Sequence, residues 1–178
     1  YEWNRLRNPE RRANTSMPGP YYAQDYWMQG HRIGVIGSSD EHSGQGGRRH
    51  GGVAVVRADS LTRPALFEAL RQRRCYATTG ERIGVEFSID GHEMGEAFTA
   101  PSGLTLRGRL RIFGTAPLLR VDLLRFRPRR DSAFIPILSV FPSGSALDYA
   151  VDWTDAFETS ALYYARAVQE PLEIGRAS

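Results

Sequence analysis

The residues of this sequence best suited to chemistry are Asp40 and His42, which stand two positions apart. They follow a short apolar run at residues 33–36 and two small residues. Side chains two positions apart on extended backbone point the same way, so a carboxylate oxygen and an imidazole nitrogen leave one strand end side by side. Such a pair supplies half of a site for Zn, Mn or Fe. The sequence therefore predicts a divalent-metal site here.

The surroundings of this pair favour the metal over the simpler alternative, a surface turn with a solvated imidazole. We predict that residues 33–36 form a buried strand, and a Gly-rich loop follows His42. In α/β folds, ligands bind where strands end and loops begin. Two ligands do not complete a site, because catalytic zinc usually takes three protein ligands.

Three further residues are weaker candidates. The loop 43–52 holds five glycines, so its backbone can approach a ligand closely. Within it, His50 could contact the metal or a substrate and Arg48 could contact an anionic group, although both also suit a solvated loop. Glu2 could be another carboxylate at a strand end, or a structural one. The loop lacks the Lys-Ser/Thr ending of a phosphate-binding loop.

Composition limits the class of protein. The 178 residues are 41% hydrophobic and 24% charged, which is typical of a soluble globular protein. No apolar run approaches the roughly 18 residues that a membrane span needs, so no membrane partner is expected, and the compartment and oligomeric state stay open. All 23 basic residues are arginines interleaved with apolar residues, a pattern of solvated faces that favours no nucleic-acid site. The lone Cys75 excludes an internal disulfide.

The first half of the chain has helical and extended patterns in alternation. A short helix is predicted over residues 21–29, and a strand over residues 52–57. A second helix, with Thr62 in its N-cap region and Pro64 in its first turn, runs to about residue 74. Its apolar residues predict a buried face, made of Leu66, Phe67 and Leu70. This order is α/β in character.

From residue 83 the hydrophobic period changes to two. Residues 83–89 alternate, Asp90 and Gly91 supply a hairpin turn, and residues 104–112 form an amphipathic strand. Several short strands indicate an antiparallel sandwich, in which we expect no gathering of titratable groups. The further strands are predicted at 118–127, 135–141, 147–153 and 161–168. The predicted domains are 1–90, an α/β metal-binding part, and 91–178, the sandwich.

Several stretches of the sequence resemble one protein group. They are GVIGSSDEHSG at 34–44, GGVAVV at 51–56, ALRQRRCYATTGERI at 69–83, GTAP at 114–117 and YYARAVQ at 163–169. They are similar to the CehA/McbA group, DUF3604-type proteins of the polymerase-and-histidinol-phosphatase (PHP) superfamily of metallohydrolases. The resemblance covers nearly the whole chain.

The resemblance implies an α+β composite fold: the last elements of a PHP-type (β/α) barrel, followed by an antiparallel β-sandwich. Asp40 and His42 correspond to the final Asp-x-His ligand motif of that superfamily, whose barrel holds two or three metals. Its first motif, a His-x-His, has no match in this sequence. The remaining ligands would then come from the missing N-terminal part of the barrel, which becomes an expected partner.

The function implied is that of a fragment of a metal-dependent hydrolase. It would act on a small-molecule substrate with an ester, carbamate or phosphoester bond through metal-activated water, with Zn or Mn as cofactor and Fe as a further option. The alternative is a non-catalytic module, a β-sandwich with a barrel remnant that serves as a scaffold or binds a partner or ligand.

Overall fold

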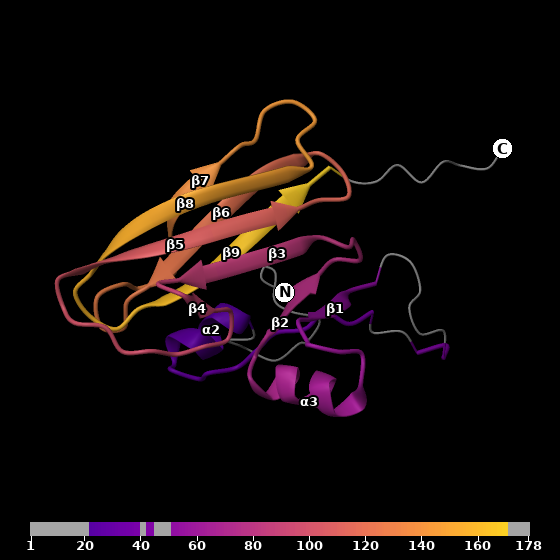
Figure 1. Ribbon diagram of the computed structural model, residues 1–178, viewed down its shortest axis with the longest axis horizontal. Coiled ribbons are helices and arrows are strands. Elements are labelled where there is room, and N and C mark those ends of the chain that lie inside the picture. The colour runs from indigo at the N-terminus through magenta and orange to yellow at the C-terminus, as the bar shows by residue number, and fades with distance from the viewer. Residues whose placement is uncertain (1–21, 40–41, 45–50, 171–178) are drawn as a thin grey trace.

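The computed structural model describes residues 22–39, 42–44 and 51–170, which are mostly antiparallel strands with two short helices and no closed barrel (Figure 1). Neither helix has the length and apolar character needed to cross a membrane. In chain order the elements are α2 (Ala23–Met28), β1 (Val53–Val56), α3 (Arg63–Arg71), β2 (Cys75–Thr78), β3 (Gly84–Ile89), β4 (His92–Glu93), β5 (Leu104–Phe113), β6 (Leu118–Phe126), β7 (Ile135–Val140), β8 (Asp148–Phe157) and β9 (Leu162–Gln169).

The described strands form three sheets. One has the order β4-β3-β5-β8, the second β7-β6-β9, and the third is the pair β1-β2. Every pairing is antiparallel. Because the strands of a (β/α) barrel pair in parallel, the β1–β2 pair does not have barrel geometry, and the structure supports only the sandwich-like part of the predicted fold.

The two larger sheets share one hydrophobic core. Strand β5 contributes Leu106, Leu110 and Ile112, which are at most 1% exposed, and β6 contributes Val121 and Leu123 at 0%. The predicted alternation along residues 104–112 is therefore confirmed, although Leu104 at its start is exposed. The predicted later strands are confirmed as well, and β8 extends beyond its predicted end to Phe157.

Two glycine positions explain details of the sheet that contains β5. Asp90 and Gly91, with φ of 47° and 81°, make the tight turn between β3 and β4, as the sequence predicts. Gly108 pairs with Trp153 of β8, and a Cβ at Gly108 would overlap the indole ring. The glycine therefore leaves room for Trp153, whose ring stacks on that of Phe87 with 6.0 Å between the ring centroids.

Helix α3 begins as predicted but packs differently. The Thr62 side chain accepts a hydrogen bond from the Ala65 N–H at 3.4 Å, which caps the helix. The predicted buried face is wrong: Phe67 is 66% exposed and Leu70 42% exposed, while Ala69 is fully buried. The apolar period identified the stripe correctly, but the elements around α3 in this chain cover its opposite side.

The run at residues 33–36 also differs from its prediction. These residues form no strand, and Ile33 and Ile36 are 43% and 56% exposed. Apolar content alone does not make a strand, because a strand needs a hydrogen-bonded neighbour and a layer over its face. This run is not in a strand and both of its isoleucines are exposed, so the predicted buried strand is wrong here.

Aromatic side chains connect α2 to the sheet β7-β6-β9. Trp27 lies 5.3 Å from the Tyr164 ring and 6.0 Å from the Phe134 ring, measured between centroids. The Gln24 side chain donates to the Tyr164 hydroxyl. Gly30, with φ of 91°, takes the left-handed position after the helix, as its sequence position predicts. Helix α2 is therefore a cover for this sheet.

Candidate functional site

The segment before Asp40 lies in close backbone contact with β1. A Cβ built on Gly37 would be 2.7 Å from the Val53 nitrogen and 2.6 Å from the Val53 oxygen. A Cβ on Gly52 would be 2.6 Å from the Ser38 oxygen. Only glycine permits both approaches. The backbone at Gly37 and Ser38, which leads to the Asp40–His42 pair, is thus held against the start of β1.

Of the predicted site residues, only His42 lies among the described ones, and it is exposed. Asp40, Arg48, His50 and Glu2 lie outside the described residues. Within the part that the structure describes, no group of three His, Cys, Asp or Glu residues could hold a metal ion. The geometry of the Asp40–His42 pair stays a prediction.

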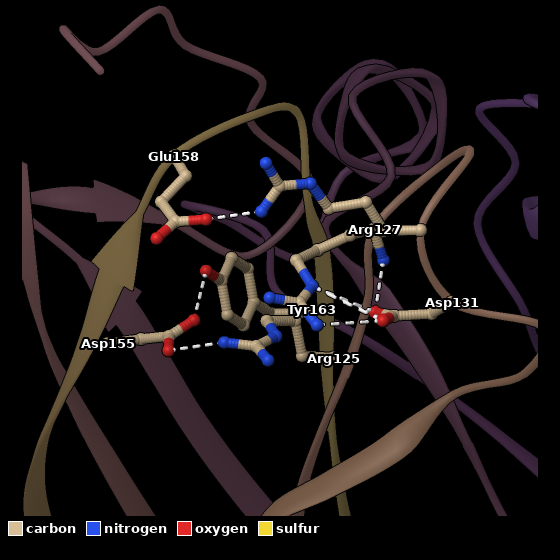
Figure 2. A network of polar contacts seen from close by, with 7 residues as sticks. Arg125, Arg127, Asp131, Asp155, Glu158 and Tyr163 are labelled. Atoms are coloured by element: carbon tan, nitrogen blue, oxygen red, sulfur yellow. Dashed lines mark hydrogen bonds and ion pairs between the residues drawn. The ribbon is translucent and has the colours of Figure 1, made fainter. Parts of the chain in front are cut away.

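The sandwich holds a polar cluster, so the prediction that no titratable groups gather there is wrong (Figure 2). Asp155 of β8 accepts hydrogen bonds from Arg125 of β6 and from the Tyr163 hydroxyl of β9, the latter at 2.7 Å. The side chains of Arg125 and Asp155 are only 11% and 12% exposed. Because β8 belongs to one sheet and the other two strands to its partner sheet, this contact joins the two layers.

The residues of this cluster, Arg125, Asp155 and Tyr163, are bonded to one another and offer no reactive group. Burial raises the pKa of Tyr163 well above its ordinary value, and the neighbouring Asp155 carboxylate raises it further. The phenol therefore stays protonated and keeps donating to Asp155. Each ionic group already has a partner of opposite charge, which leaves no free base or nucleophile among these three residues.

The same end of the sandwich carries a second ion pair. The Asp131 carboxylate accepts from the Arg127 backbone N–H at 2.8 Å and from its guanidinium at 2.8 Å, as Figure 2 shows. The hydrogen bond from the Arg127 side chain lowers the pKa of Asp131. Arg130 pairs with Glu158 nearby. These contacts fix the loop that follows β6.

Asp122 occupies a separate polar site on β6 and is fully buried. It accepts from Ser139 at 2.6 Å, from Arg166 at 2.6 Å and from Arg120 at 2.8 Å. Burial by itself would raise the pKa of Asp122, but these hydrogen bonds lower it below its ordinary value. Asp122 is therefore a charged hub that binds three neighbours. The signal in the sequence was polar residues within largely apolar strands, Asp122 on β6, Ser139 on β7 and Arg166 on β9, which strand prediction alone does not bring together.

A surface pocket of about 310 Å³ lies between the end of α3 and the loop after β4. Arg73 donates to the Gly95 carbonyl oxygen at 2.9 Å, and Arg71 pairs with Glu68 at 3.1 Å. The pocket is lined by Glu68, Arg71, Gln72, Arg73, Arg74, Gly95 and Glu96. Two of its guanidinium groups are engaged by protein oxygens, so the pocket marks a junction between α3 and the loop after β4.

Part of this chain is similar to a known protein family. Residues 45–102, from the Gly-rich loop to the turn before β5, match the family model "Protein of unknown function (DUF3604)". This stretch is DUF3604-like. No solved structure matches the chain.

The matching relatives are uncharacterised bacterial proteins. One from Chlamydia muridarum is 30% identical over 134 residues, and one from Chlamydia trachomatis is 32% identical over 135 residues. Each alignment covers 67% of this chain and 20% of the relative. A Chlamydia pneumoniae protein is 33% identical over 105 residues, 57% of this chain and 16% of the relative. The chain thus spans about a fifth of the length of the first two relatives.

Proposed function

We propose that this chain is part of a metal-dependent hydrolase in which Asp40 and His42 are two of the metal ligands. The observation that carries the proposal is the position of the Asp-x-His pair. It immediately precedes the DUF3604-like stretch and follows a segment whose glycines hold it against β1. A pair at the end of a positioned segment, with a Gly-rich loop beside it, suits a ligand better than an unsupported surface turn does.

The donor set suits a divalent metal of the Zn, Mn or Fe type. Asp40 would provide an anionic oxygen, and His42 would provide a neutral imidazole nitrogen from an exposed position. Once bound, such a metal lowers the pKa of a coordinated water and polarises an ester, carbamate or phosphoester oxygen. His50, Arg48 and Glu2 remain weaker proposals for contacts to metal or substrate.

The resemblance to the CehA/McbA group and the PHP superfamily supports the same proposal at a finer level. On that basis the other ligands belong to a barrel in the remainder of a longer polypeptide. The two ligands of this chain would then close a site that it does not complete alone. Carboxyl or carbamate esters are the substrate class that the resemblance favours.

The test is metal content in the longest natural polypeptide that contains this chain. We expect Asp40→Ala and His42→Ala each to lower the metal bound per chain at least about tenfold, the lower limit for disturbing even an outer-shell partner of a metal. Asp152→Asn is the matched control, because its carboxylate is 76% exposed on the sandwich. Plasma emission analysis of the protein after gel filtration measures the number of metal ions bound per chain.

The same variants should lose hydrolysis of nitrophenyl ester, carbamate or phosphoester probes. Unchanged metal content and hydrolysis in Asp40→Ala would refute the hydrolase proposal. The alternative, a non-catalytic scaffold module, would then be the better account. One observation favours that alternative: the sandwich has a complete core, and the acidic groups of its buried clusters, Asp122 and Asp155, are bonded to neighbouring arginines.

A further inference from the structure

One face of α3 combines exposed apolar and basic side chains. Phe67 is 66% exposed and Leu70, three positions later, is 42% exposed. Arg63 and Arg71 stand four positions before and after Phe67, so all four side chains share one side of the helix. We call these four residues the Phe67 face. Ala69, on the opposite side, is the residue that α3 buries completely.

This arrangement reverses the usual order of a surface helix, which buries its large apolar side chains and exposes its polar ones. Other apolar residues near the Phe67 face are exposed as well. Leu61, just before the helix, is 91% exposed. Of the described apolar residues before Gly84, only Tyr22, Ala69 and Cys75 are buried. Single exposed apolar residues are normal, but apolar side chains that gather on one face beside charged ones are typical of a contact surface.

The charges on the Phe67 face argue against a second copy of the chain as its occupant. In a two-fold symmetric contact the same patch meets itself. Arg63 and Arg71 of both copies would then lie in one contact, where their positive charges repel. Glu68, which pairs with Arg71 at 3.1 Å, is the acidic residue within α3 that could offset them.

The lengths of the relatives indicate another occupant. The chain spans 20% of the first two relatives, and the part that matches the DUF3604 model, residues 45–102, contains α3. We propose that the Phe67 face packs against another part of a longer polypeptide, on an apolar surface with acidic residues at its rim. This contact does not depend on metal binding, so it stands or falls separately from the proposed function.

Hydrogen exchange tests the contact without any substitution. The amides of residues 66–71 are compared in the 178-residue chain and in the longest natural polypeptide that contains it. We expect at least about tenfold slower exchange in the longer polypeptide, because a covered helix opens less often. The amides of β5, buried in both, serve as the internal reference. Equal exchange of α3 in the two proteins would overturn the proposal.

A substitution then identifies the residue responsible. Phe67→Gln keeps a good helix former but removes the apolar ring. We expect it to leave the melting temperature of the 178-residue chain unchanged within about 1 °C and to lower that of the longer polypeptide by at least about 3 °C. Leu147→Gln is the matched control, because Leu147 is 50% exposed on the sandwich, and it should change neither protein.

Two results would contradict this assignment. If Phe67→Gln behaves like Leu147→Gln in the longer polypeptide, the face is open to solvent. If light scattering finds the 178-residue chain dimeric and Phe67→Gln makes it monomeric, the occupant is a second copy. Failure of the longer Phe67→Gln polypeptide to fold, while the short variant folds normally, supports the proposal.

Discussion

The parts of the molecule before and after Gly84 are stabilised in different ways. After Gly84 the strands form two sheets around a shared core, with Leu110 and Val121 fully buried. Before Gly84 the strands β1 and β2 make a two-stranded sheet, and the largest side chains of α3 face solvent. An isolated pair of strands is marginal by itself. The difference indicates that the sandwich supplies most of the stability of this chain, while the first part relies on contacts with its neighbours.

Several of those contacts lie among the described residues near β2 and α3. The Tyr76 hydroxyl of β2 donates to the Ile83 carbonyl at 2.9 Å and accepts from the Val85 N–H at 3.0 Å. Arg57 pairs with Glu93 at 2.8 Å. Gly95, with φ of 92°, lies so close to Gln72 that any Cβ would meet its carbonyl oxygen. The segment from β1 to β2 is therefore attached to the sandwich through polar and backbone contacts, whereas α2 is attached through the aromatic contacts of Trp27.

The two parts should differ most in how much unfolding free energy is lost when a leucine is replaced by alanine. Leu110→Ala should lower the free energy of unfolding by about 4 kcal/mol, because it leaves a cavity in a closed core. Leu70→Ala should cost less than about 1 kcal/mol, since an exposed side chain gains little from burial. Chemical denaturation of the 178-residue chain measures both. Similar losses in the two variants would contradict the comparison.

The next effect belongs to the buried hub of the sandwich. Asp122→Asn removes the charge that Arg166 and Arg120 share, and Arg166 is only 14% exposed. Breaking a buried pair by removing one partner costs about 3 kcal/mol. Urea denaturation at neutral pH measures the loss. The matched variant is Asp148→Asn, whose partner Arg111 is 41% exposed, and it should cost much less. A smaller loss in Asp122→Asn than in Asp148→Asn would contradict the assignment of Asp122 as a hub.

The same residue makes stability depend on pH. The folded chain lowers the pKa of Asp122 below its ordinary value of 3.8. A group with a lowered folded pKa binds protons more readily when unfolded, so its stabilisation is full above about pH 4 and is lost as the pH falls further. We expect the wild-type chain to lose stability more steeply than Asp122→Asn below that pH. Parallel curves for the two proteins would refute this role.

These effects also show which parts of the fold could be predicted from the sequence. Alternation of the type found at residues 104–112 depends on which face meets a core, and that local pattern predicted β5 and its buried leucines. Turn residues such as Asp90 and Gly91 have conformational preferences of their own, so they were predicted as well. The predictions that were confirmed, strand β5 and the turn at Asp90 and Gly91, depend only on residues that are close together in the sequence.

What failed depends on distant partners. The pattern in α3 predicted an apolar stripe that includes Phe67. It could not predict that the rest of the described chain packs against the opposite side of the helix, where Ala69 is buried. The Arg125–Asp155 contact joins strands 30 residues apart in sequence, so no local period predicts it. Asp40 and His42 could be proposed as ligands from their types and spacing, but their geometry depends on residues outside the described ones.

A smaller effect should come from the contact between the two parts. Tyr76→Phe leaves the Val85 N–H without its hydroxyl partner, and we expect a loss of about 1 kcal/mol. Hydrogen exchange should show β2 opening more often while β6 stays protected. Tyr149→Phe, on β8 of the sandwich, is the control. Equal loosening of β2 and β6 would mean that the two parts unfold as one unit.

The smallest expected effect is on the outer surface of the sandwich. Arg109 and Asp152 are directly opposite on β5 and β8, and their charged groups approach to 3.4 Å. Both side chains are well exposed, at 62% and 76%. Water and salt screen such a pair, so a double-mutant cycle of Arg109→Ala and Asp152→Asn should give a coupling below about 0.5 kcal/mol. A coupling above about 1 kcal/mol that persists in concentrated salt would show that this outer face is covered, as the Phe67 face is proposed to be.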